Sequence, residues 1–420
     1  MPTLTFKNRT NQWQIDLNLL IFNLLCIYAF FVPLEMILEE LLQIRTILKP
    51  YRVTAIAIFG LFVFKNIQSG IQIRQDVRQD SLLYALFGYG LIISAFRMIT
   101  ETFSTGLFYN DLFQLIIYLS VFFVVKNLPL TVQQIKTIFW SLLAGVMVNV
   151  VTILNGFLLL RNFERQSGFM DNPNYLGFAL LAVSLFLLVY FRQRTLFKQI
   201  SVIILLIAVL ISFVVAGSRT CLIVLVMGLI YLAGIQNLRR KIIIFAVSAF
   251  AIGIAVLRFG GYERIAPLIV FNRLDRGVSE ENIRITLWKG VIEASNETYF
   301  VGLGIGQFKA RFAEFFRESA HQDIYEMVTF GYYLTAHSDY FTVLIVYGIV
   351  GLVCYIGYLF IAARKRFYQL QLHASTKLRQ FQHLQVLLLL SVIVFGFTHE
   401  SFTSGIYWLT LTFATKSVEK

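Results

Sequence analysis

Residues 201–234 read SVIILLIAVLISFVVAGSRTCLIVLVMGLIYLAG, and Arg219 is the one charged residue among them. Two apolar runs flank Gly217, Ser218 and Arg219, and each has about the length of 20 residues that an α-helix needs to cross a bilayer. The connection is too short for anything but a tight turn, so we expect two antiparallel neighbouring helices. Arg219 is then held at a membrane surface.

The rest of the chain has the same apolar character. Of its 420 residues, 58% are hydrophobic and 14% are charged, whereas a soluble domain carries about 25% charged residues. A water-soluble fold is therefore excluded. The net charge of +13 comes from short basic clusters between apolar runs rather than a basic stripe, which argues against nucleic acid as a partner. Cys26, Cys221 and Cys354 lie inside apolar runs, and we expect them to pack between helices.

Apolar runs of spanning length recur along the whole sequence and predict an all-α, polytopic membrane protein with about twelve transmembrane helices in a single domain, residues 1–420. The predicted spans lie near residues 17–37, 50–66, 82–98, 110–126, 137–160, 175–191, 198–216, 220–236, 241–258, 338–363, 384–398 and 402–416.

Basic residues concentrate in alternate connections between these spans, as the positive-inside rule requires, and this places both termini in the cytoplasm. One long connection, residues 258–337 between the ninth and tenth spans, is then extracytoplasmic. Loops of this length usually have a function. Within it, residues 282–295 read as a helix with Leu287 and Val291 on one face. Residues 308–316 form a second amphipathic stretch, suited to the headgroup plane.

Two arginines on this outer side are candidates for an anion site. Arg219 either anchors its hairpin among lipid headgroups or binds a phosphate, because a guanidinium presents forked donors and the following helix has a positive amino end. Arg284 lies on the predicted loop helix. It is either an ordinary solvated residue paired with Glu280 or a second phosphate ligand.

His337 ends the long loop, just before an apolar run, in the sequence AHSDY. Histidine changes charge near neutral pH and is the usual general acid or base, although a membrane-edge histidine is also often a plain interfacial residue. Asp339 is placed to orient or compensate it. His399 and Glu400 form a second polar pair in the last outer turn. Gly302, Gly304 and Gly306 predict a turn and not a nucleotide site, and no metal-binding motif occurs.

These residues fall in four segments that together resemble the bacterial O-antigen ligase and O-antigen polymerase superfamily of membrane glycosyltransferases. The segments keep their order and spacing, with the long loop between the second and the fourth. They are RQSGFMDNPNYLGFAL (165–180), AGSRTCLIVLVMGLI (216–230), RITLWKGVIEASNETYFVGLGIGQF (284–308) and AHSDYFTVLIVYGIVGLVCY (336–355).

The resemblance implies a GT-C-like fold and an inverting transfer of a glycan from undecaprenyl diphosphate at the outer face of the inner membrane, without a metal or other cofactor. The paired arginines of the family match Arg219 and Arg284, and its loop-terminal histidine matches His337. Ser338 stands where many relatives have asparagine. Arg165, Asp339 and His399 complete the candidate substrate-binding residues.

Two activities within the superfamily stay open. A polymerase extends a lipid-linked repeat, with a polysaccharide chain-length regulator as a candidate partner, and is favoured here. A ligase moves the finished glycan to lipid A core or another acceptor. A lipid-linked sugar transporter is a third reading, but transporters usually place charged residues near mid-membrane in two related halves. The predicted spans are nearly free of charge, and the long loop occurs once.

Overall fold

The computed structural model describes residues 16–42, 49–69, 77–100, 103–158, 166–190, 196–234, 279–316, 336–372 and 375–418. Helices dominate these ranges, and no strand occurs in them. The all-α prediction is therefore confirmed for the described part of the chain.

Eight described helices are long and apolar enough to cross a membrane, so the protein is a multi-pass integral membrane protein. They are α1 (Leu17–Phe31, continued by the 3₁₀ turn η1, Val32–Leu34), α3 (Pro50–Ser69), α4 (Val77–Thr100), α5 (Thr105–Asn127), α6 (Val132–Leu158), α7 (Pro173–Tyr190), α16 (Asp339–Gln371) and α17 (Thr376–Thr398). A short helix, α2 (Ile37–Leu42), follows η1.

The remaining predicted spans have different outcomes. The hairpin at Arg219 is present as α8 (Leu196–Ala216) and α9 (Arg219–Ala233), although their described apolar stretches are shorter than those of the eight spans. The run at 402–416 forms α18 (Gly405–Thr415), a helix of 11 residues. At about 16 Å it is too short to cross a hydrocarbon core of about 30 Å. The predicted span 241–258 lies outside the described residues.

Several helix ends are fixed by local sequence signals. At α6, the Thr131 hydroxyl accepts a hydrogen bond from Gln134 N, and Gln134 Oε1 accepts one from Thr131 N. This reciprocal pair is a capping box. Pro50 and Pro173 begin α3 and α7, where the missing N–H of proline costs nothing.

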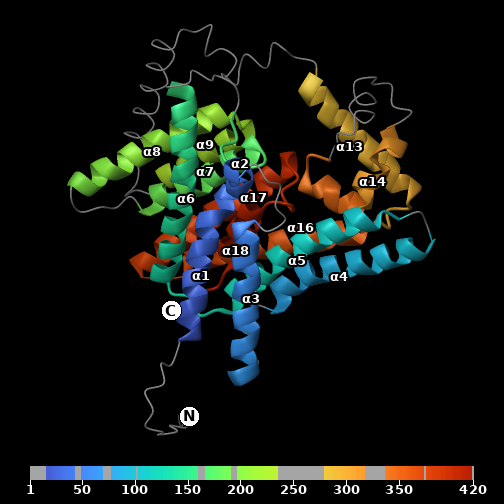
Figure 1. Ribbon diagram of the computed structural model, residues 1–420, viewed down its shortest axis with the longest axis horizontal. Coiled ribbons are helices and arrows are strands. Elements are labelled where there is room, and N and C mark those ends of the chain that lie inside the picture. Colours follow the sequence, from blue (N-terminus) through green and yellow to red (C-terminus); the bar gives the residue numbers. More distant parts are fainter. Residues whose placement is uncertain are drawn as a thin grey trace.

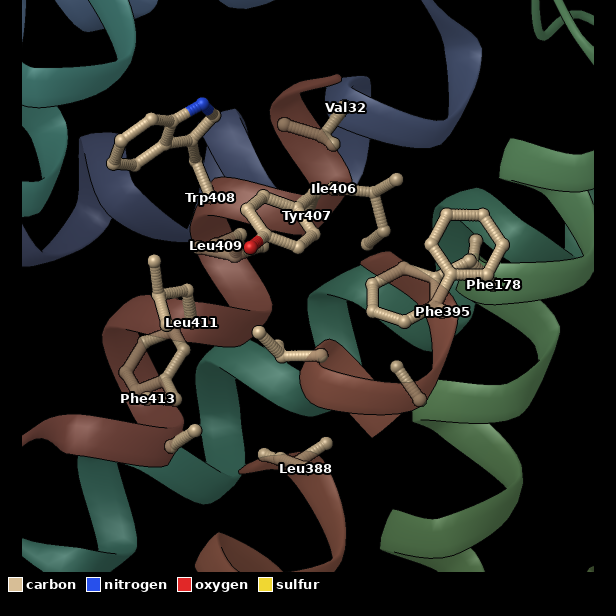
Figure 2. Close-up of a cluster of buried hydrophobic side chains, with 14 of the residues drawn as sticks. Val32, Phe178, Leu388, Phe395, Ile406, Tyr407, Trp408, Leu409, Leu411 and Phe413 are labelled. Atoms are coloured by element: carbon tan, nitrogen blue, oxygen red, sulfur yellow. The ribbon is translucent and has the colours of Figure 1, made fainter. Parts of the chain in front are cut away.

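The core is centred on α18, whose residues are all buried. Figure 1 shows α17 and α18 between α8 and α9 on one side and the loop helices on the other. Figure 2 shows Phe178 of α7 and Phe395 of α17 facing each other, with Tyr407 of α18 nearby. The two phenyl rings stack with centroids 4.4 Å apart. The apolar run of α18 thus serves packing inside the protein and not contact with lipid.

The loop helices predicted at 282–295 and 308–316 are present as α13 (Ser279–Glu297) and α14 (Gln307–Phe316). Leu287 and Val291 are buried as expected. Both helices pack against α16. The described part of the predicted loop 258–337 is limited to these helices, the turn between them and Ala336 and His337, so its course as one connection stays a prediction.

The predicted glycine turn holds α13 and α14 in place. The helix α16 breaks at Gly348, where φ is +65°. Leu303 N and Gly304 N donate to two carbonyl oxygens at this break, Ile345 O (2.8 Å) and Val346 O (3.0 Å). Non-helical backbone is tolerated at membrane depth where protein groups satisfy it. The glycines therefore form a turn, as predicted, and this turn docks on α16.

An ion pair that the sequence does not reveal lies at the far end of α5. Asp80 and Lys126 are both buried, and their charged groups are 3.0 Å apart. Lys416 Nζ donates to Leu128 O (2.8 Å) at the same end of α5. A cation is favourable at the carboxyl end of a helix, so these residues stabilise the meeting of α5 with the end of α18.

Candidate functional site

A polar cavity of about 470 Å³ opens between segments that are far apart in the sequence. Its walls come from the turn after α1, the start of α3, the start of α7, α14 and the turn before α18. The lining residues are predominantly charged or hydrogen-bonding: Glu35, Lys49, Tyr51, Arg52, Gln114, Asp171, Asn172, Asn174, Tyr175, Lys309, His337, His399, Glu400 and Thr403. Two of the predicted site residues, His337 and His399, are among them.

The turn at residues 399–404 contributes three of these lining residues, and its irregular backbone is held by side chains from other parts of the bundle. Its carbonyl groups accept three hydrogen bonds from side chains: Glu400 O from Tyr175 Oη (2.6 Å), Phe402 O from Trp408 Nε1 (2.8 Å) and Thr403 O from Tyr118 Oη (2.9 Å). An irregular turn inside a membrane protein needs such partners. The turn is therefore a fixed part of the cavity wall.

Asp339 lies beneath this turn and not in the cavity lining. It is fully buried at the first position of α16. Its Oδ1 accepts a hydrogen bond from Ser401 N (2.6 Å), and its Oδ2 accepts one from the Ser401 hydroxyl. The structure thus places Asp339 where it positions the turn that carries His399 and Glu400.

His399 is connected to the Arg219 hairpin by a short chain of hydroxyl groups. Its ring stacks on Phe395, with centroids 4.3 Å apart. Its Nδ1 is 2.8 Å from Thr398 Oγ1, which is 2.7 Å from Thr220 Oγ1. Thr220 directly follows Arg219, the first residue of α9. The hairpin at Arg219 is therefore packed against the end of α17 that faces the cavity.

His337 is held in an uncommon backbone conformation, with φ at +48°. The left-handed region costs a non-glycine residue about 1–2 kcal/mol, so the surrounding contacts must enforce it. Trp288 Nε1 donates to Ala336 O (3.0 Å), and the Trp288 ring stacks on Phe341 at 5.1 Å. These contacts on both sides of His337 fix its position at the cavity.

Arg284 lies on the same helix as Trp288, one turn earlier in α13. Residues four apart share a helix face, so the helix that holds the backbone next to His337 also carries Arg284 on that face. Arg284 and Arg219 are each partly buried. Neither arginine is among the described residues that line the cavity. Each lies on a helix that is hydrogen-bonded beside one of the two cavity histidines, α9 beside His399 and α13 beside His337. Arg165 lies outside the described residues.

The cavity also contains charged residues that the sequence did not single out. Lys49 and Arg52 flank the start of α3. Lys309 of α14 forms an ion pair with Asp111 at 3.0 Å. Burial lowers the pKa of Lys309, but attraction from Glu400 and Asp111 outweighs this and raises the pKa above its ordinary value. Lys49 and Arg52 could have been identified from the sequence by their position on the predicted outer side, where the positive-inside rule disfavours cations.

Glu35 is the most enclosed carboxylate of the lining, with 8% of its surface exposed. Its Oε1 accepts a hydrogen bond from Asp171 N (3.1 Å). Burial raises the pKa of Glu35, while the charge of Lys49 and this hydrogen bond act in the opposite direction. No sequence motif marks this residue.

Part of the chain is similar to a known protein family. The family model described as O-antigen ligase matches residues 204–356, a range that includes Arg219, Arg284 and His337. No curated protein matches the chain. Residues 204–356 are therefore similar to the O-antigen ligase family, which confirms the resemblance to the ligase and polymerase superfamily. The family supports a membrane glycosyltransferase activity of this general type.

Proposed function

We propose that the protein transfers a glycan from undecaprenyl diphosphate to an acceptor at the outer face of the cytoplasmic membrane, by an inverting reaction without a metal. One observation carries the proposal: a polar cavity is lined by two histidines, and each is tied to a helix that carries one of the predicted arginines. A diphosphate needs such paired cationic ligands. The lipid tail would remain in the bilayer.

In this proposal the diphosphate is the leaving group. The acceptor oxygen forms a bond to the anomeric carbon while the bond from that carbon to the diphosphate oxygen breaks. The diphosphate departs with the electron pair. Arg219 and Arg284 compensate the negative charge that develops, which is where preorganised donors contribute most to catalysis. His337 either accepts the acceptor proton or holds a phosphate in line.

The cavity has a suitable size for this chemistry. At about 470 Å³, it lies within the range of about 300–1,000 Å³ that is usual for small-molecule sites. Its mixture of carboxylates, amides and hydroxyl groups suits sugar hydroxyls, and its cations suit phosphate. Membrane lipids, the lipid-linked donor and a glycan or lipid A core acceptor are the proposed partners.

We favour a surface-polysaccharide or O-antigen polymerase, and the family description names the alternative, a ligase. Product analysis after gene deletion tests both. Glycan linked to undecaprenyl diphosphate should accumulate, and a gene copy with Arg219→Ala should not remove it. Single repeats on the acceptor would indicate a polymerase, whereas full-length chains left on undecaprenyl diphosphate would indicate a ligase. Unchanged lipid-linked glycan would contradict the proposal.

A further inference from the structure

The cavity wall that follows α1 contains a carboxylate that the steps above do not use. Glu35 comes directly after the turn η1 and lines the cavity that contains His337 and His399. It is buried, and a carboxylate in such a position costs free energy unless cations or hydrogen bonds compensate it. Carboxylates of this kind cluster at functional sites.

The backbone on both sides of Glu35 is pinned. Asn149 Nδ2 donates to Pro33 O (2.6 Å), and Met36 N donates to Phe169 O (2.9 Å). Asn149 Oδ1 in turn accepts from Phe169 N (2.6 Å). These bonds join the turn after α1 to the segment before α7, so Glu35 has little freedom to move away from the cavity.

The side chain is also oriented. Asp171 N donates to Glu35 Oε1, and within the described part of the chain no hydrogen bond reaches the second oxygen, Oε2. One oxygen is thus used for orientation, and the residue itself lines the cavity. A general base held by a fixed hydrogen bond is a recurring arrangement in enzymes.

Glu35 compares favourably with the other two carboxylates of the lining. Asp171 is exposed to solvent and Glu400 is partly exposed, whereas Glu35 is buried. A carboxylate removed from water is a stronger base than a solvated one. Lys49 and Arg52 lie within electrostatic range of Glu35 and favour its ionised form, which a base requires. The negative charge of Asp171 acts in the opposite direction and favours the protonated form of Glu35.

We infer that Glu35 is the general base of glycan transfer. The inference rests on the proposed function. The Glu35 carboxylate takes the proton of the acceptor hydroxyl as the acceptor oxygen bonds to the anomeric carbon. The bond to the diphosphate breaks in the same step, and Arg219 and Arg284 receive the leaving charge. His337 then belongs to the phosphate side of the reaction.

Glu35→Gln is the informative variant, because the amide oxygen can still accept from Asp171 N while the amide cannot accept a proton. In a reconstituted assay with lipid-linked donor and defined acceptor, kcat should fall on the order of 100-fold or more. Donor affinity should change by less than about threefold. Glu40→Gln is the matched control, since Glu40 is an exposed acidic residue of the next helix outside the cavity, and its rate should be native.

A second variant covers the case in which the glutamine protein does not fold. Glu35→Met places an apolar stem of similar length in a buried position, and such replacements are often tolerated. An acceptor with a thiol in place of its hydroxyl ionises without a strong base. It should therefore restore much of the rate in either variant, which a purely structural role of Glu35 would not allow.

A near-native kcat in a folded Glu35→Gln or Glu35→Met protein would overturn the assignment, and so would failure of the thiol acceptor to restore the rate. Either result leaves the proposed function intact if the native protein transfers glycan and Arg219→Ala does not. Absence of transfer by the native protein would instead contradict the proposed function itself.

Discussion

Asp339→Ala tests how the cavity wall is positioned. The native carboxylate accepts two hydrogen bonds from Ser401, one from its backbone N at 2.6 Å and one from its hydroxyl. Because Asp339 and Ser401 are both fully buried, water cannot replace these bonds. Alanine would leave two donors of Ser401 without a partner, directly beside His399 and Glu400.

The expected loss follows from these two bonds. Leaving a buried donor unsatisfied costs about 1–3 kcal/mol, so Asp339→Ala should lower the free energy of unfolding by about 2–6 kcal/mol. Asp339→Asn keeps one acceptor oxygen for Ser401 N and should lose about half as much. Misplacement of a catalytic or binding group by about 1 Å lowers rates on the order of 100-fold, so transfer should fall as well.

Unfolding of the purified protein in detergent and transfer in the reconstituted assay measure the two effects. Asp111→Ala is a matched control for the unfolding measurement, because its ion pair with Lys309 is partly exposed and such pairs contribute about 1 kcal/mol or less. Native stability and native transfer in Asp339→Ala would refute the view that Asp339 holds the turn.

Three further predictions concern charge. Arg219→Lys and Arg284→Lys should recover little of the activity lost in the alanine variants, because lysine keeps the charge but lacks the forked guanidinium; full transfer by both would rule out bidentate phosphate binding. Transfer by the native protein should fall as pH drops through the pKa of Glu35, which burial raises above its ordinary value, because a protonated carboxyl cannot accept a proton. This acidic fall in the transfer rate should vanish in Glu35→Gln. Its persistence in that variant would point to another titrating group. A cysteine at exposed Lys289 should react with an impermeant thiol reagent in intact cells, and one at exposed Lys377 should react only after lysis. Labelling of the native chain is the control. The reverse pattern would place the cavity on the cytoplasmic side of the membrane.

Sequence patterns predicted the features that depend on local composition. The hairpin at Gly217, the buried face of α13 at Leu287 and Val291, and the turn that begins at Gly302 all follow from spacing that a single segment contains. The predicted span at 402–416 was wrong, because this apolar run forms the short buried helix α18. Hydropathy does not distinguish a helix that faces lipid from one that is buried in protein.

The cavity could be predicted only in part, because it depends on which helices meet. His337 was found from its position at the end of the loop. Glu35 meets Asp171 through contacts between α1, α6 and the segment before α7, and no local pattern encodes that meeting. Thr220 and Thr398 contact each other across 178 residues of sequence. Lone polar residues of this kind become informative only when the fold brings them together.

The most direct test of the proposed function is to follow both products of a single reaction. Purified protein in lipid vesicles is given an undecaprenyl-diphosphate-linked glycan and a defined acceptor, and transferred glycan and released undecaprenyl diphosphate are measured together. We expect equal amounts of the two, no effect of EDTA, and loss of both in Arg219→Ala and Arg284→Ala. Failure to release undecaprenyl diphosphate, a loss in EDTA that metal restores, or native release by both alanine variants would contradict a metal-free transfer at this cavity.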